Sequence, residues 1–142
     1  MNASRAFRRQ RGVAAVEFAL VSSVFLTMLI GVMEMGRLLW TWNAAVEATR
    51  LGARLAVVCD LNDTIVQTRM QQMLPSLSAA NITITYLPNA CTTATCTSVR
   101  VQLTGYTHQT IIPLAPISVD LPPFSTTLRK EFMQSTGNSA CS

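Results

Sequence analysis

The apolar positions of the chain change their pattern twice, and each pattern predicts a different kind of element. Residues 13–33 are apolar around the whole circumference of a helix, with Glu17 as their only charge. At about 1.5 Å per residue such a helix is about 32 Å long, close to the roughly 30 Å hydrocarbon core of a bilayer. This segment therefore predicts a transmembrane helix with a single carboxylate near one end.

The helical pattern continues through residues 34–58, where no proline occurs. Apolar residues recur there at helical spacing, namely Met35, Leu38, Leu39, Trp42, Ala45, Val46, Ala53 and Ala56. Polar residues gather on another face, where Glu47 can reach Arg50 three positions further on. We expect one helix over 13–58, apolar on all sides in its first part and amphipathic in its second, where it forms the spine of a soluble domain.

Small residues recur every four positions along this helix in two ridges. The first ridge consists of Ala15, Ala19, Ser23, Thr27 and Gly31. The second ridge consists of Ala44, Ala48, Gly52 and Ala56. Because small residues let another backbone approach closely, we expect the first ridge to pack against a helix in lipid. The second can contact either the chain's own sheet or a partner, and chance spacing of common helix residues is the alternative for both.

Residues 59–142 predict a small α+β domain that begins with a turn and a short helix. The helix covers about 64–74, with Asn62 or Asp63 as its N-cap and Pro75 at its end. Its inward residues are expected to be Ile65, Met70, Met73 and Leu74.

Alternation with a period of two begins after this helix and predicts strands. β-Branched residues alternate over 82–87 and 99–104, and a third run over 124–132 is rich in Thr and aromatic residues. A loop at 88–96 separates the first two runs, and prolines punctuate the longer connection before the third. The expected fold class is therefore α+β: a long N-terminal transmembrane helix that continues into a domain with a short helix and a three-stranded antiparallel sheet.

The positive charge of the chain is concentrated before the apolar segment. The net charge is +4, and four of the eleven basic residues are Arg5, Arg8, Arg9 and Arg11. Basic residues beside an apolar span usually stay in the cytoplasm, so we expect residues 1–12 there and residues 59–142 outside it. This arrangement explains the basic character of the chain better than binding of nucleic acid does.

The apolar segment is also longer than the apolar region of a cleaved secretory signal. It ends in residues 33–37, where no small-residue cleavage site follows. The adjacent Arg8 and Arg9 are weak support for twin-arginine export. We therefore expect a retained membrane anchor.

Four cysteines lie on the expected outer side, where an oxidising compartment favours disulfides. Of the three possible pairings we prefer Cys91 with Cys96 and Cys59 with Cys141. Zinc is disfavoured, since Cys91 and Cys96 lack a usual ligand spacing and His108 is remote. We expect neither a metal nor a cofactor.

Catalysis is also disfavoured by the sequence. His108 is the one histidine, and neither a nucleophile motif nor a metal motif frames it. It is expected to be a solvated loop residue, and the chain is expected not to be an enzyme.

The junction between the basic and apolar segments resembles that of type IV pilins, with Gly12 before the cut and Glu17 as the fifth residue after it. The longer stretch 11–21 (RGVAAVEFALV) resembles the TadE-like family of tight-adherence (Tad) pilus proteins, as do 34–37 (EMGR) and 51–54 (LGAR). The resemblance covers about the first fifty-five residues. It implies a pilin-like fold in which the anchor helix continues into the outer domain.

The resemblance further implies that a prepilin peptidase of the inner membrane cuts between Gly12 and Val13. The mature protein would be a minor pilin, or pseudopilin, that acts in assembly of a Flp-type (type IVb) pilus or a related secretion apparatus. Its implied partners are membrane lipid, the peptidase, other pilin-like subunits and the Tad assembly machinery. It would cross the inner membrane once, with a periplasmic C-terminal domain, and either enter the surface pilus or stay at its base.

Cleavage would give Val13 an α-amino group, which is largely protonated at neutral pH because its usual pKa is about 7.7–8.0. Glu17 lies one helical turn away and is expected to pair with the amine of a neighbouring subunit. Its alternative role is a hydrated carboxylate at the membrane edge that pairs with its own amine. The alternative function is a single-pass anchored binding module, an adhesin or sensor ectodomain, which needs no cut at Gly12.

Overall fold

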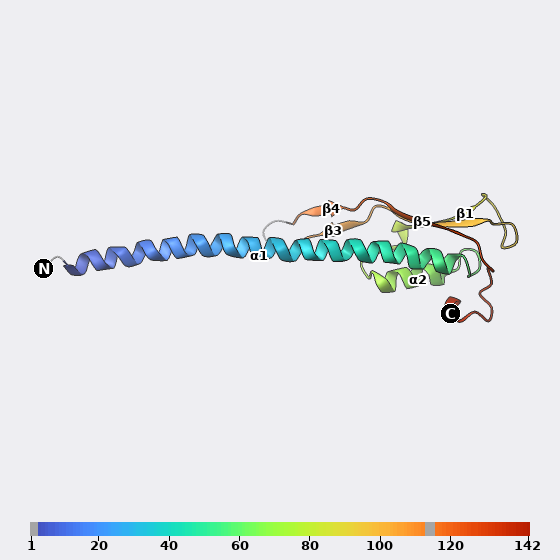
Figure 1. Cartoon of the computed structure of the whole chain (residues 1–142), viewed down its shortest axis with the longest axis horizontal. Helices are drawn as coiled ribbons and strands as arrows, with labels where there is room; N and C mark the ends of the chain where they lie inside the picture. The colour runs from blue at the N-terminus through green and yellow to red at the C-terminus, as the bar shows by residue number, and fades with distance from the viewer. Residues whose placement is uncertain (1–2, 113–115) are drawn as a thin grey trace. The chain divides into compact units, whose positions relative to one another are not determined.

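The computed structural model describes residues 3–112 and 116–142, with side chains from residue 12 onward (Figure 1). The expected basic cluster therefore lies outside the described side chains. The chain forms two compact units, Met1–Arg37 (unit 1) and Leu38–Ser142 (unit 2). The helices are α1 (Ala3–Ala56) and α2 (Thr64–Met73), and 3-10 turns cover Ala79–Asn81 and Ser139–Cys141. The strands are β1 (Ile82–Leu87), β2 (Ser98–Leu103), β3 (Thr107–Gln109), β4 (Ser118–Asp120) and β5 (Phe124–Arg129).

Helix α1 is longer at its N-terminal end than the sequence predicted. It extends back to Ala3 instead of beginning at Val13, and it ends at Ala56, two residues before the expected end. Gly12 therefore lies inside the helix. A glycine in a helix interior costs only about 1 kcal/mol relative to alanine, which is too little to end a helix that contains no proline.

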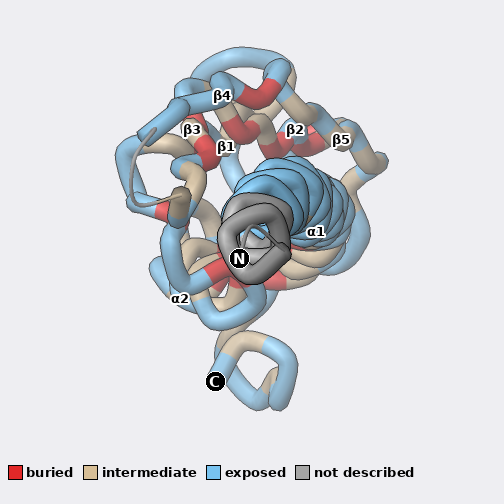
Figure 2. The backbone as a smooth tube through the Cα atoms, turned by 90° about the vertical axis from the view of Figure 1, so that its left-hand side faces the viewer, coloured by how far each residue is buried: buried red, intermediate tan, exposed pale blue. Residues whose placement is uncertain are grey.

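The second part of α1 forms the centre of unit 2. Ala45, Ala48, Ala53 and Ala56 are fully buried and belong to one core with α2 and the strands. Figure 2 shows the buried positions gathered on the strands and around α2. Of the apolar residues that recur at helical spacing, Met35, Leu39 and Trp42 are exposed, whereas the alanines of the same series are buried. Close approach of the neighbouring elements to α1 requires small side chains, so the alanines take the inner face.

Helix α2 agrees with the prediction at both ends. Asp63 is the N-cap, its side chain accepting a hydrogen bond from the backbone N–H of Ile65, and the helix stops just before Pro75. Its buried face is the row Val66, Met70 and Leu74 at steps of four. Met73, predicted to point inward, is 40% exposed because it falls beside this row.

The predicted three-stranded antiparallel sheet is confirmed, with the order β1-β2-β5. Its register places Val101 opposite Ile84 on one side and opposite Thr126 on the other. The last strand ends at Arg129, earlier than the predicted run to Phe132.

A second sheet, the β3-β4 hairpin, was not predicted from the sequence. Its strands contain three residues each, and all three residues of β4 are exposed. Strands this short leave no readable alternation, so the stretch was assigned to a connection punctuated by prolines.

Candidate functional site

The apolar part of α1 presents its large side chains outward. Between Val13 and Met33 the exposed members are Val13, Val16, Phe18, Leu20, Val21, Val24, Phe25, Leu26, Met28, Leu29, Ile30, Val32 and Met33. Among the described residues there is one helix long and apolar enough to cross a membrane, with a mean hydropathy of 2.2 and no burial of its apolar window. The chain thus has one candidate membrane helix near its N-terminus, consistent with single-pass anchoring.

Gly12 has no packing reason to be a glycine. Among the described residues, no atom lies within 4 Å of a Cβ placed at Gly12. At Gly52, by contrast, a Cβ would collide with Met70 and approach a methyl group of Val101 to 3.3 Å. Gly31 and Gly36 on the same helix are equally open, so packing within the described chain requires a glycine at none of these three positions.

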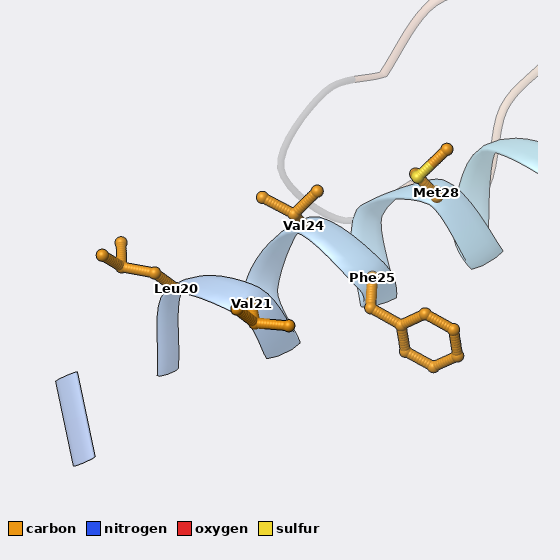
Figure 3. A pocket seen from close by; sticks show the side chains of 5 residues that line it. All are labelled: Leu20, Val21, Val24, Phe25 and Met28. Carbon is orange, nitrogen blue, oxygen red and sulfur yellow. The ribbon is translucent and has the colours of Figure 1, made fainter. Parts of the chain in front are cut away.

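Glu17 continues a row of apolar residues along the exposed helix. Val21 and Phe25 follow it at steps of four, so the three side chains lie on one line of the helix surface. The neighbouring row is formed by Leu20, Val24 and Met28. Figure 3 shows these two apolar rows, which line a shallow hollow. A groove between two such rows is the feature that receives a ridge of another helix.

The first small-residue ridge, from Ala15 to Gly31, is exposed at each of its five positions. Its two hydroxyl groups are already hydrogen-bonded within the helix. Ser23 Oγ donates to the carbonyl of Leu20 at 2.8 Å, and Thr27 Oγ1 donates to the carbonyl of Ser23 at 2.7 Å. The hydroxyl protons therefore need no outside acceptor in lipid. The ridge combines small side chains with hydroxyl groups whose hydrogen bonds are made within the helix.

The second ridge is used inside unit 2. Ala48, Gly52 and Ala56 are buried, and Ala44 is half-buried. The atoms around Gly52 come from α2 and β2, so the ridge brings α1 close to both elements. Of the two roles that the sequence left open for this ridge, contact within the chain is the one that the structure contains.

An ion pair follows the apolar segment directly. Arg37 Nη1 donates to both carboxylate oxygens of Glu34, at 2.9 and 2.8 Å, and the Glu34 side chain is only 15% exposed. The pair was missed in the sequence, although its spacing of three residues on a helix is the signal that would have indicated it. Mutual neutralisation lowers the cost of placing both charges near the end of an apolar span.

The four cysteines form two disulfides, Cys59 with Cys141 and Cys91 with Cys96. This is the pairing preferred from the sequence. The first joins the end of α1 to the C-terminal segment, and the second closes a small loop. Lys130 Nζ donates to the carbonyls of two residues in that loop, Thr93 and Ala94.

A polar cluster holds the C-terminal segment beside the start of α2. Ser135 Oγ donates to Asp63 Oδ2 at 2.6 Å and accepts from the backbone N–H of Asp60 at 2.9 Å. The Ser135 hydroxyl, together with the N–H of Ile65, lowers the pKa of Asp63 below its usual 3.8. Burial raises the pKa of the nearby Tyr86, whose hydroxyl accepts from the N–H of Asn62.

The environment of His108 differs from the expectation. It lies on β3 opposite Val119 and is buried, whereas the sequence suggested a solvated loop residue. Within the described ranges 3–112 and 116–142, no group of three or more His, Cys, Asp or Glu is placed to hold a metal ion.

These features define a chain with a candidate single-pass membrane anchor and a disulfide-linked α+β unit. The comparison with known families is more specific, because residues 12–54 match the family described as TadE-like protein. The resemblance noted in the sequence is thereby confirmed, and the match begins at Gly12 itself. TadE-like proteins are associated with the Tad pilus machinery and with the membrane. Neither the curated proteins nor the solved structures compared with the chain gave a match.

Proposed function

We propose that this chain is a minor pilin, or pseudopilin, which acts in assembly of a Tad pilus or a related secretion apparatus. In this proposal a prepilin peptidase removes residues 1–12 and leaves Val13 as the new N-terminus. The observation that carries the proposal is the combination at the junction: the TadE-like match begins at Gly12, and Glu17, the fifth residue after it, lies on an exposed apolar helix.

The role of Glu17 follows from its place on an exposed apolar helix. An ionised carboxylate near either surface of the hydrocarbon core of a bilayer is energetically costly unless it pairs with a cation. The α-amino group created at Val13 is such a cation, and in an assembly the amine of a neighbour would pair with Glu17. The apolar hollow that begins at Leu20, one turn further along, would receive a ridge of that neighbour, so charge pairing and packing would select the same register.

The orientation belongs to the same proposal. The arginines before Gly12 would hold the leader in the cytoplasm and place unit 2 in the periplasm. Two disulfides suit that compartment because it is oxidising. The chain would act as a structural subunit and not as an enzyme, with other pilin-like subunits as its partners in the membrane.

One observation favours a second candidate, an anchored adhesin or sensor ectodomain. Unit 2 contains its own buried core and both disulfides, so its fold does not depend on a neighbouring subunit. This candidate requires neither cleavage nor a role for Glu17.

The Glu17→Gln variant separates the two candidates, because it removes the charge while keeping the side-chain size. If Glu17 pairs with a neighbour's amine, loss of one partner costs about 3–5 kcal/mol, so incorporation into pili should fall by more than about 100-fold. Immunoblotting of sheared pili and of membranes measures both the incorporated and the inserted protein.

The matched control is Glu47→Gln, which removes an exposed carboxylate from α1 in unit 2. It should leave incorporation unchanged. Both variants should remain in the membrane fraction. Normal incorporation of the Glu17→Gln protein would contradict the pairing role.

A further inference from the structure

The β3-β4 hairpin carries apolar side chains that the core of unit 2 does not use. Ile111 is 70% exposed, Ile117 is 54% exposed, and Val119 on β4 is also exposed. Among the described residues of the hairpin, 107–112 and 116–120, Asp120 is the one Asp, Glu, Lys or Arg, and its carboxylate accepts a hydrogen bond from Thr107 Oγ1 at the base of the hairpin. These three side chains do not belong to the described buried core of unit 2.

The position of the hairpin within unit 2 follows from two contacts of β5. The ring of Phe124, at the start of β5, lies 5.2 Å from that of Trp42, and the N–H of Glu131, just after β5, donates to the carbonyl of Val57. Strand β5 therefore runs along α1 from the level of Trp42 toward the C-terminal end of the helix.

The hairpin precedes β5 in the chain and lies on the other side of Phe124 along α1. Leu121, between β4 and β5, donates its N–H to the carbonyl of Tyr106 and fixes the base of the hairpin there. Along α1, β3 and β4 thus lie toward the Leu38 end of unit 2, whereas β1 and the end of β5 lie toward Ala56 (Figure 1).

The Leu38 end of unit 2 is also the end nearest the membrane segment along the chain. Five residues lead from Met33 to Leu38. Even fully extended they reach at most about 18 Å, so this end stays close to the bilayer surface whatever the arrangement of the two units. Trp40 is 62% exposed at the same end, and tryptophan is enriched where proteins meet the lipid headgroups.

We propose that the β3-β4 hairpin seats on the bilayer, with Ile111 and Ile117 inserted into the surface of the leaflet that unit 2 faces and Trp40 in the same interfacial layer. Asp120 lies at the base of the hairpin, opposite Thr107, and the described residues nearer the turn carry no Asp, Glu, Lys or Arg, so the contact is apolar and needs no anionic lipid. The hairpin thereby gives unit 2 a second attachment to the membrane besides the anchor helix. The proposal depends on the anchor alone and would hold equally for a chain that is never processed at Gly12.

Photocrosslinking of the full-length chain, one copy per phosphatidylcholine nanodisc, tests this contact. The photoreactive residue p-benzoylphenylalanine replaces Ile117 in one protein and Thr93 in the control. Both positions are exposed, and Thr93 lies in the loop closed by Cys91 and Cys96, away from the hairpin. A non-reducing gel verifies that both proteins retain their disulfides.

The expected result is a yield of lipid adduct at position 117 at least ten times that at position 93, as measured by mass spectrometry. Replacing half of the phosphatidylcholine with phosphatidylglycerol should change that yield by less than twofold. Equal yields at the two positions would overturn the proposal. So would adducts from position 117 that form in cells with protein and not with lipid, since they would assign the hairpin to a partner subunit.

Discussion

The two parts of α1 carry ridges of small residues with the same spacing but opposite surroundings. The ridge from Ala15 to Gly31 is exposed, whereas the ridge from Ala44 to Ala56 lies against α2 and β2. Small residues at steps of four thus predict close approach by another backbone in both parts. In unit 2 the chain itself supplies that backbone, from α2 and β2, whereas packing of a second helix on the ridge in unit 1 stays a prediction.

The largest expected effect comes from opening the disulfide that closes unit 2. Cys59 and Cys141 are 82 residues apart, so replacing both with alanine should lower the free energy of unfolding by about 4–5 kcal/mol. The control opens the small loop through Cys91 and Cys96, five residues apart, and should cost only about 2 kcal/mol. Denaturant unfolding of the full-length protein in micelles, followed by near-ultraviolet circular dichroism, measures both.

Membrane insertion should be unchanged in both disulfide variants, because unit 1 contains none of the four cysteines. Equal losses of stability in the two variants would contradict the account of the long disulfide.

A glycine-to-leucine substitution in each ridge compares the two parts of α1 directly. Gly52→Leu forces a side chain into Met70 and Val101, and such overpacking should cost unit 2 about 2–3 kcal/mol. At Gly31 no described atom lies within 4 Å of an added Cβ, so Gly31→Leu should leave the unfolding of unit 2 unchanged. The same unfolding measurement applies, and equal stability of the two variants would show that the second ridge is not packed as described.

A smaller, pH-dependent effect is expected from Ser135→Ala. At neutral pH the loss of the hydroxyl should lower the free energy of unfolding by about 1 kcal/mol. Because the folded pKa of Asp63 is lowered, its contribution is complete above the unfolded pKa near 3.8 and is lost as the pH falls through the folded value. The difference between wild type and variant should therefore shrink on acidification below that pKa.

Unfolding titrations at neutral and strongly acidic pH measure this difference. Ser139→Ala, on the same segment, is the control and should show no such trend. A difference between wild type and Ser135→Ala that grows on acidification would contradict the assigned hydrogen bond.

Much of the fold was predictable because it depends on local patterns. Neighbouring residues alone determine the N-cap at Asp63, the end of α2 before Pro75 and the alternation in β1 and β2. The buried face of α1 was predicted only in part: the pattern included Ala45 and Ala53, which are buried, but also Leu39, which is exposed because tertiary packing leaves room only for small side chains on the inner face.

For the candidate site as well, features that depend on neighbouring residues were predicted from the sequence, and contacts between distant residues were not. Gly12 and Glu17 were identified through local spacing, and their roles stay predictions. The hydrogen bond between Asp63 and Ser135 was not found, since its partners are 72 residues apart and no local pattern relates them.

The central claim is that the chain is processed between Gly12 and Val13, and the N-terminus of the membrane-extracted protein tests it most directly. Gly12→Val and Gly36→Val form a matched pair, because neither glycine has a described atom within 4 Å of an added Cβ. The N-terminal peptide of each protein is measured by mass spectrometry in cells with and without a prepilin peptidase. Wild type and Gly36→Val should begin at Val13 when the peptidase is present and keep the leader when it is absent. Gly12→Val should keep the leader in both. A wild-type protein that keeps Met1 in cells making the peptidase would contradict the account.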